Sequence, residues 1–264
     1  MSEVREIHVT EVPLFRLCRL RWHYQYREGL VPREEDTGPL WFGTGVHYAL
    51  AQAYSNRVHP RDALLDWEGY RGNSVPLLGE ILEHYAEHYR DDFDHWEVLG
   101  VETPVRSRLR RGLYLVGTFD LLVKETSGRI WIVDHKTRTY FDSPDDLEIE
   151  EQVTGYLYLA SREGIPASGM IWNEIRKASP RSNPRVTEFF RRTKLFRSPI
   201  EIRGYYEDLL STATEMFSKY TAIYPNPGIH CGQQRCPYRI LCRARRQGSD
   251  VNELKSTLYT TGGS

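Results

Sequence analysis

Two short apolar segments rich in β-branched residues stand out in the middle of the chain, at 114–124 (YLVGTFDLLVK) and 129–137 (RIWIVDHKT). The turn-forming residues at 126–128 separate them, so the pattern predicts a β-hairpin. One acidic residue interrupts each apolar run, Asp120 in the first and Asp134 in the second.

Lys136 follows Asp134 by two positions, which places both side chains on the same face of a strand. Charged groups within apolar strands are costly to bury unless they bind an ion or one another. A divalent cation with oxygen ligands would remove that cost. The alternative puts both acids at strand ends in solvent, with Lys136 as a surface partner. Because both acids lie inside apolar runs, we favour the metal interpretation.

The same reading along the rest of the chain predicts an α/β protein with further helices and strands. The Gly43–His47 segment should start a helix that carries His47, and Gln152 and Tyr156 should share one face of another helix. Helices are expected over about 12–26, from 44 onwards, and over 77–89, 147–162 and 200–220. Strands are expected over 96–103, 167–174 and 186–191.

The length suits one large domain, or one domain with an appendage. Apolar runs never approach ~18 residues, so we expect no membrane-spanning helix. The first residues lack an apolar signal core, which predicts an intracellular, cytoplasmic protein. The phosphate-binding pattern G-x-x-x-x-G-K-(S/T) is missing, so ATP is not expected as a ligand.

The formal net charge is −1, but arginines gather locally. One group interleaves with aromatic residues near the N-terminus, and two others lie at 106–111 and 243–246. Segregated charge of this kind can form a basic face for phosphates, although a mixed solvated surface is an equal alternative for any single run. The DNA contacts expected on this basis are Arg19, Arg21, Trp22, Tyr24 and Arg108.

Three of the four cysteines, Cys231, Cys236 and Cys242, cluster near the end of the chain, and Cys18 lies far from them. Intracellular proteins rarely use disulfides, so a shared metal site is favoured. Four thiolates suit a 4Fe–4S cluster or a structural zinc, and His230 could replace one thiol at zinc. Four unconnected buried thiols are the alternative, which the tight late group disfavours.

Asp120 followed by Asp134-x-Lys136 resembles the core of the PD-(D/E)xK nucleases. The segments Gly43-Thr-Gly-Val-His47 before it and Gln152-x-x-x-Tyr156 after it are similar to the RecB-like branch. That branch includes the nuclease domains of RecB and AddB and the CRISPR-associated Cas-four exonucleases. The resemblance spans about Cys18 to Cys242.

The resemblance implies a restriction-endonuclease-like core, a central mixed β-sheet flanked by helices. Mn²⁺ or Mg²⁺ would be held by His47, Asp120, Asp134 and the His135 backbone carbonyl, with Glu102 as a further ligand. Lys136, Gln152 and Tyr156 would act in catalysis or in positioning.

The resemblance also implies an iron–sulfur staple that joins both chain ends through Cys18, Cys231, Cys236 and Cys242. The first late spacing, four intervening residues where the branch commonly has two, departs from its pattern. The expected division is an N-terminal helical segment at 1–40, a nuclease core at 41–225, a cysteine segment at 226–247 and a disordered tail at 248–264.

The function expected from this resemblance is that of a metal-dependent DNA exonuclease. Its context would be recombination, repair, phage replication or CRISPR adaptation in a prokaryotic or phage-infected cell. The partners are DNA, single-stranded or with free ends, and proteins of recombination or CRISPR adaptation, and a homo-oligomer would fit a processive enzyme. The alternatives are a catalytically silent iron–sulfur DNA-binding adaptor and a structure-specific endonuclease.

Overall fold

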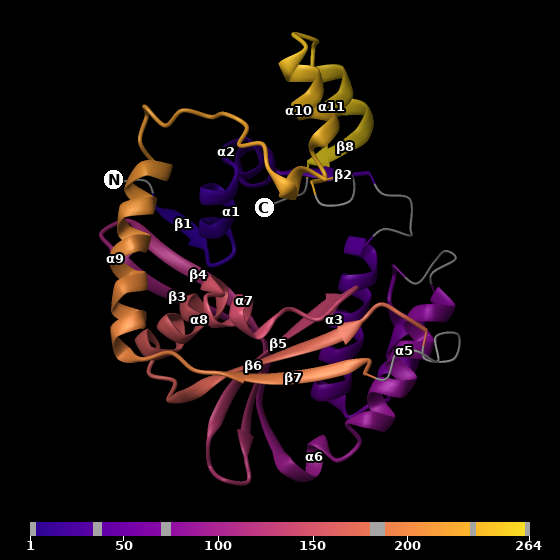
Figure 1. Cartoon of the computed structure of the whole chain (residues 1–264). Coiled ribbons are helices and arrows are strands. Elements are labelled where there is room, and N and C mark those ends of the chain that lie inside the picture. Colours follow the sequence, from indigo (N-terminus) through magenta and orange to yellow (C-terminus); the bar gives the residue numbers. More distant parts are fainter. Residues whose placement is uncertain (1–3, 34–38, 70–74, 180–187, 233–235, 262–264) are drawn as a thin grey trace.

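A computed structural model describes residues 4–33, 39–69, 75–179, 188–232 and 236–261. Its centre is a six-stranded mixed β-sheet with helices on both faces (Figure 1), so the expected α/β class is confirmed. The strand order is β1-β4-β5-β6-β7, and β3 pairs with the other edge of β4. The strands are β1 (Arg5–His8), β3 (Trp96–Arg110), β4 (Leu113–Glu125), β5 (Ile130–Arg138), β6 (Ala167–Arg176) and β7 (Phe190–Leu195).

Strand β4 has two different partners along one edge. The parallel strand β1 pairs with residues 113–116, and the antiparallel strand β5 pairs with residues 121–124. The four residues from Gly117 to Asp120 lie between these two partners on that edge. The predicted β4–β5 hairpin is therefore present, and its ladder ends just before Asp120 and Asp134.

Helices cover the two faces of the sheet through separate apolar clusters. On one face Val46, Leu82 and Val133 belong to a cluster shared by the sheet with α3 and α5. On the other face Phe15, Leu159 and Leu209 belong to a cluster shared with α1, α8 and α9. The helices of the first face are α3 (Pro39–Asn56), α5 (Val75–His88) and α6 (Asp92–His95), and α4 (Pro60–Ala63) and a 3-10 turn (Leu64–Asp66) join α3 to α5. The second face carries α1 (Glu11–Leu17), α7 (Pro144–Glu148), α8 (Glu151–Arg162) and α9 (Pro199–Met216).

A small lobe formed by both ends of the chain lies at one end of the molecule (Figure 1). Its core contains Leu20, Leu241 and Tyr259. Strands β2 and β8 pair antiparallel within it. Its elements are α2 (Arg19–Trp22), a π-helical turn (His23–Arg27), β2 (Leu30–Pro32), a 3-10 turn (Ile229–Cys231), α10 (Arg239–Arg246), α11 (Asn252–Leu258) and β8 (Tyr259–Thr261).

Three sequence-based expectations need correction. The helix expected over 12–26 breaks at Cys18, whose backbone is extended. The N-terminal segment is more than a helical appendage, because β1 pairs with β4 in the main sheet. The tail expected to be disordered forms α11 and β8, because β2 supplies a pairing partner that the local sequence does not reveal.

Among the described residues, none of the helices combines the length and apolar character that crossing a membrane requires. The strand expected at 186–191 begins later, at Phe190, and its first two residues fall outside the described part.

Candidate functional site

Three side chains from three elements meet at the gap in β4, which is the stretch from Gly117 to Asp120 that lies between the partners β1 and β5 on one edge of the strand. His47 comes from α3, Glu102 from β3 and Asp120 from β4, and one ligand atom of each lies within 4.8 Å of the other two. Nδ1 of His47 is 3.4 Å from Oδ2 of Asp120. The segments that supply them are far apart in sequence, so the sheet is what brings them together.

Asp120 is held as an ionised carboxylate. The backbone N–H of His135 donates to its Oδ2 over 2.7 Å, which uses the end of the β4–β5 ladder. Burial alone would raise the pKa of Asp120, but the hydrogen bond and charge of His47 and the His135 N–H lower it to about 2. Burial alone would lower the pKa of His47, but the hydrogen bond and the charge of Asp120 raise it.

Glu102 has an unusual backbone, with φ of 45°. It lies between the pairs Val101–Leu121 and Thr103–Phe119, directly across from Asp120 in the ladder. A non-glycine residue with positive φ is strained, and such strain concentrates at functional sites. Partial desolvation of the carboxylate and the neighbouring charge of Asp120 raise its pKa. The strained backbone therefore holds two carboxylates close together.

Asp134 lies beside this group and pairs with Lys136. The ammonium Nζ is 2.6 Å from Oδ2 of Asp134, and Nε2 of Gln152 donates to Oδ1 over 2.9 Å. Asp134 is only 1% exposed. Burial raises its pKa to about 6, although the charge of Lys136 opposes the increase. The spacing of two residues thus places both groups on one face, as the sequence predicts.

Helix α8 brings Gln152 and Tyr156 over the gap in β4. Glu150 caps the helix by accepting from the N–H of Gln152. Arg197 donates to the carbonyl oxygens of Leu147 and Glu150, and so fixes the junction between α7 and α8. A side chain at Gly117 would collide with the ring of Tyr156, because its Cβ would lie 2.8 Å from Cε1. Burial raises the pKa of Tyr156, which keeps its hydroxyl protonated.

The His135 side chain points away from Asp134, to the face covered by α3. Nδ2 of Asn173 donates to Nδ1 of His135 over 2.7 Å, and the ring stacks on Tyr54. Burial lowers the pKa of His135 to about 3, so its imidazole is neutral. The ring also lies edge to face with that of His47, at 6.0 Å between the ring centroids, and the expected role of the His135 carbonyl as a ligand stays a prediction.

Two groups that support the site are not among the residues expected from the sequence. Trp172 places its ring 4.7 Å from Nζ of Lys136 and donates its indole N–H to Asp142. Asn173, 0% exposed, joins His135 to a buried cluster that ends in the ion pair of Arg192 with Asp92. The signal was present: Asn173 and Glu174 interrupt an apolar strand, as Asp134 does in β5.

The donors fit a divalent cation. One imidazole and two carboxylates suit Mn²⁺ or Mg²⁺, and the imidazole favours Mn²⁺ somewhat because it is the softer ligand. Asp134 is not in the three-residue group, and its carboxylate is paired with Lys136 and Gln152. Its expected role as a ligand stays a prediction.

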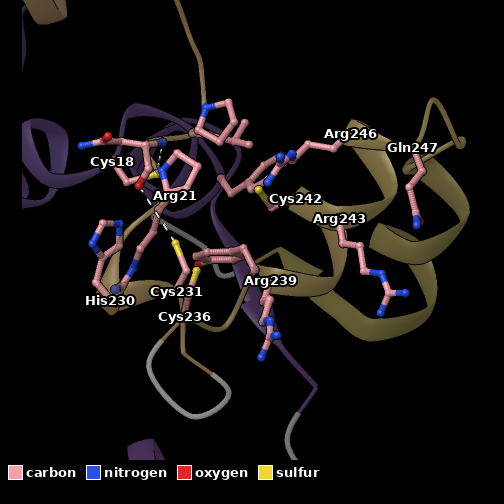
Figure 2. A pocket seen from close by; sticks show the side chains of 16 residues that line it. Cys18, Arg21, His230, Cys231, Cys236, Arg239, Cys242, Arg243, Arg246 and Gln247 are labelled. Atoms are coloured by element: carbon pink, nitrogen blue, oxygen red, sulfur yellow. Dashed lines mark hydrogen bonds between the residues drawn. The ribbon is translucent and has the colours of Figure 1, made fainter.

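The four cysteines line one cavity of about 530 Å³ in the lobe (Figure 2). Cys18 comes from the break between α1 and α2, and its Sγ accepts from the N–H of Asn226. Cys242 lies on α10, Cys231 ends the 3-10 turn, and Cys236 lies on the loop before α10. Burial raises the pKa of both Cys236 and Cys242, and the other thiols add to the increase. Distant parts of the sequence therefore converge here.

The spacing of the sulfurs bears on what the cavity could hold. All four cysteines are in the described part of the chain, and no three of their sulfurs come within 4.8 Å of one another. Zinc in a tetrahedral thiolate site, at about 2.3 Å from each sulfur, needs sulfurs about 3.8 Å apart. The buried Nε2 of His230, at the edge of the cavity, makes no hydrogen bond within the described residues.

The DNA contacts predicted near the N-terminus are partly wrong. Trp22 and Tyr24 are each 2% exposed, so neither ring can stack on a base. The indole of Trp22 instead donates to Glu11 in the core. Arg19 pairs with Glu215, and Arg21 lines the cysteine cavity. Arg108 is exposed on β3 and stays a prediction.

A mixed sheet with a His, Glu and Asp cluster beside an Asp-x-Lys pair defines the class of metal-dependent nucleases. The family model of the PD-(D/E)XK nuclease superfamily matches residues 7–243. The chain therefore belongs to the PD-(D/E)XK nuclease superfamily. Membership implies a hydrolase that acts on nucleic acid with a divalent metal.

A solved structure named "Crystal structure of SSO0001" is similar to this chain, at 18% identity and a TM-score of 0.42. The match covers 92% of this chain and 88% of that one. A search of curated proteins gave no match.

Proposed function

We propose that the protein is a DNA exonuclease that acts on DNA ends or single strands with Mn²⁺ or Mg²⁺. The convergence of His47, Glu102 and Asp120 within 4.8 Å carries this proposal. In the Asp134–Lys136 pair beside them, the positively charged ammonium of Lys136 would lie close to a scissile phosphate. A silent adaptor would have no need for this combination of strained, buried and charged groups.

His47, Glu102 and Asp120 would hold the metal, with Asp134 and the His135 carbonyl as further ligands. When bound, the ion would polarise the phosphate and lower the pKa of a bound water. The low pKa of Asp120 keeps this ligand ionised across the physiological range. The positive φ of Glu102 belongs to the backbone position directly across from Asp120.

Lys136 would orient the attacking water and stabilise negative charge on the phosphoryl oxygens as the ester P–O bond breaks. Gln152 holds Asp134 from the opposite side, so the carboxylate cannot rotate away from Lys136. The ring of Trp172 lies against the ammonium of Lys136. Tyr156 would contact the DNA backbone or position Gln152.

The test is digestion of end-labelled single- and double-stranded DNA with Mn²⁺, with Mg²⁺ and with chelator. Asp120→Asn and Lys136→Ala should each lower the rate by at least about 100-fold. Asp94→Asn, an exposed acid on α6, is the matched control and should cleave normally. Cleavage of circular single-stranded DNA would replace the exonuclease with an endonuclease, and inactivity of the wild type under all metals would leave the adaptor.

We also propose that the cysteine cavity holds a 4Fe–4S cluster. The wide sulfur spacing and the size of the cavity support a group larger than one ion. The cluster would join α1 and α2 to α10. Such a link would stabilise the loops around the cavity, which make few apolar contacts.

Metal analysis after purification without oxygen tests this proposal. Iron and inorganic sulfide should be present, with visible absorbance, and Cys236→Ala should lose them. A colourless wild-type protein that contains zinc and no iron would contradict the cluster.

A further inference from the structure

An exposed aromatic ring stands just beyond the candidate active site. Tyr140 follows the end of β5 and is 73% exposed. The guanidinium of Arg176 lies 5.6 Å from the centre of its ring, and its Nε donates to the carbonyl of Thr139 over 3.1 Å. Arg176 therefore supports both the ring and the backbone that carries it, while most of the Tyr140 side chain stays open to solvent.

The neighbouring residues hold this segment in place. Two guanidinium groups lie near the ring of Phe141, that of Arg191 at 4.6 Å and that of Arg176 at 5.6 Å from the ring centre. The N–H of Asp142 donates to Glu174 over 2.7 Å, and Glu174 in turn pairs with Arg191 at 2.6 Å. Glu174 is fully buried, so these contacts anchor the segment to β6. The ring of Tyr140 is thus presented by a fixed support.

The position of Tyr140 relates it to the catalytic groups. It follows Lys136 by four residues, which limits the distance between their Cα atoms to about 14 Å. Lys136 lies near the carboxyl end of β5, and Tyr140 lies just beyond that end. A strand whose phosphate reaches Lys136 would therefore pass within a few nucleotides of this ring.

Two guanidinium groups lie against the rings of this segment. Arg176 lies against Tyr140 and Phe141, and Arg191 lies against Phe141. Asp142 and Glu174 pair with Arg138 and Arg191, and the exposed acids Asp145, Asp146 and Glu148 follow on α7. Aromatic rings among arginines are the usual composition of a surface that binds single-stranded nucleic acid, by stacking on bases and attracting phosphates.

We propose that Tyr140, backed by Arg176, is a stacking platform for single-stranded DNA that leads into the active site. This inference rests on the proposed nuclease function and adds a preference for an unpaired strand next to the scissile phosphate. Tyr140 thus takes the role that the sequence assigns to Trp22 and Tyr24, whose rings are buried.

The test is equilibrium binding of a fluorescent oligothymidylate, measured by anisotropy in chelator so that no cleavage occurs. Tyr140→Ala should weaken binding by about 5- to 100-fold, because one stacked base is lost. Tyr140→Phe keeps the ring and should stay within about twofold of the wild type. Tyr220→Ala is the matched control, because Tyr220 is 81% exposed beside a lysine but lies beyond α9.

A second DNA, a duplex closed at both ends by hairpins, tests the preference for unpaired bases. Tyr140→Ala and the wild type should bind this closed duplex with the same affinity. The platform is overturned if Tyr140→Ala binds oligothymidylate as well as wild type does, if both DNAs are weakened equally, or if the wild type does not bind oligothymidylate. Failure of the nuclease proposal appears separately, as absence of metal-dependent cleavage by wild type.

Discussion

Asp134 and His135 are neighbours in sequence and buried, but the pleat sends them to opposite faces of β5. Burial shifts both groups towards their neutral forms. The pKa of Asp134 rises from 3.8 to about 6, and that of His135 falls from 6.5 to about 3. Each shift makes folding depend on pH, with opposite signs.

The signs follow from which state binds more protons. Below pH ~6.5 the unfolded chain protonates His135 and the folded protein does not, so stability is lost as pH falls. Between pH ~6 and ~4 the folded protein protonates Asp134 and the unfolded chain does not, so stability is gained. Each effect amounts to ~1.4 kcal/mol per pH unit, and over this range they cancel.

Replacing His135 should expose the contribution of Asp134. When the pH is lowered from 7 to 5, the unfolding free energy of His135→Asn should shift towards the folded state by about 2 kcal/mol relative to the shift in the wild type. The measurement is urea unfolding at both pH values in chelator, and the cost of the smaller side chain cancels in the difference. Equal pH dependence in both proteins would mean that His135 is not held neutral.

At the scale of elements, the gap in β4 creates the site. Two partners on one edge leave four residues of β4 between them, and Asp120 is the last of these. The irregular strand β3 places Glu102 opposite it, at the cost of positive φ. Strain of this kind costs about 1–3 kcal/mol and persists only where surrounding contacts enforce it.

Relieving the strain at Glu102 should therefore separate stability from activity. Glu102→Gly should gain about 1 kcal/mol in unfolding free energy and lose metal-dependent cleavage. Arg57→Gly is the matched control, because Arg57 also has positive φ, 55°, at the end of α3. It should gain similar stability and cleave normally. Urea unfolding and the cleavage rate as a function of Mn²⁺ concentration measure both effects.

Elements with a local signal could be predicted from sequence. The hairpin, the Asp134–Lys136 face and the helix carrying Gln152 follow from periodicity and from the motif they resemble. The break at Cys18 could not, because Asn226, which is far away in sequence, donates to Sγ of Cys18 and to the carbonyl of Leu17 beside it. The platform at Tyr140 was missed because a single exposed ring carries no periodic pattern.

At the scale of the whole molecule, both ends of the chain build the lobe that holds the cysteine cavity. Tyr238 donates its hydroxyl to the carbonyl of Leu30, and Tyr259 stacks on Tyr238. Tyr259 also donates to Pro237, and β8 pairs with β2. The last described residues thus support the loop that carries Cys236, while the nuclease sheet has its own two apolar clusters.

Truncation should therefore damage the lobe and spare the sheet. A chain that ends at Gly248 loses α11 and β8, leaves β2 unpaired and exposes Tyr238, so it should bind less metal than the full chain. Its far-UV circular dichroism should change little, because the main sheet and its helices remain. A chain that ends at Thr261 keeps every described contact of the lobe and should match the full protein in metal content and protease resistance. Full metal content in the shorter chain would show that the cavity does not depend on the C-terminal helix and strand.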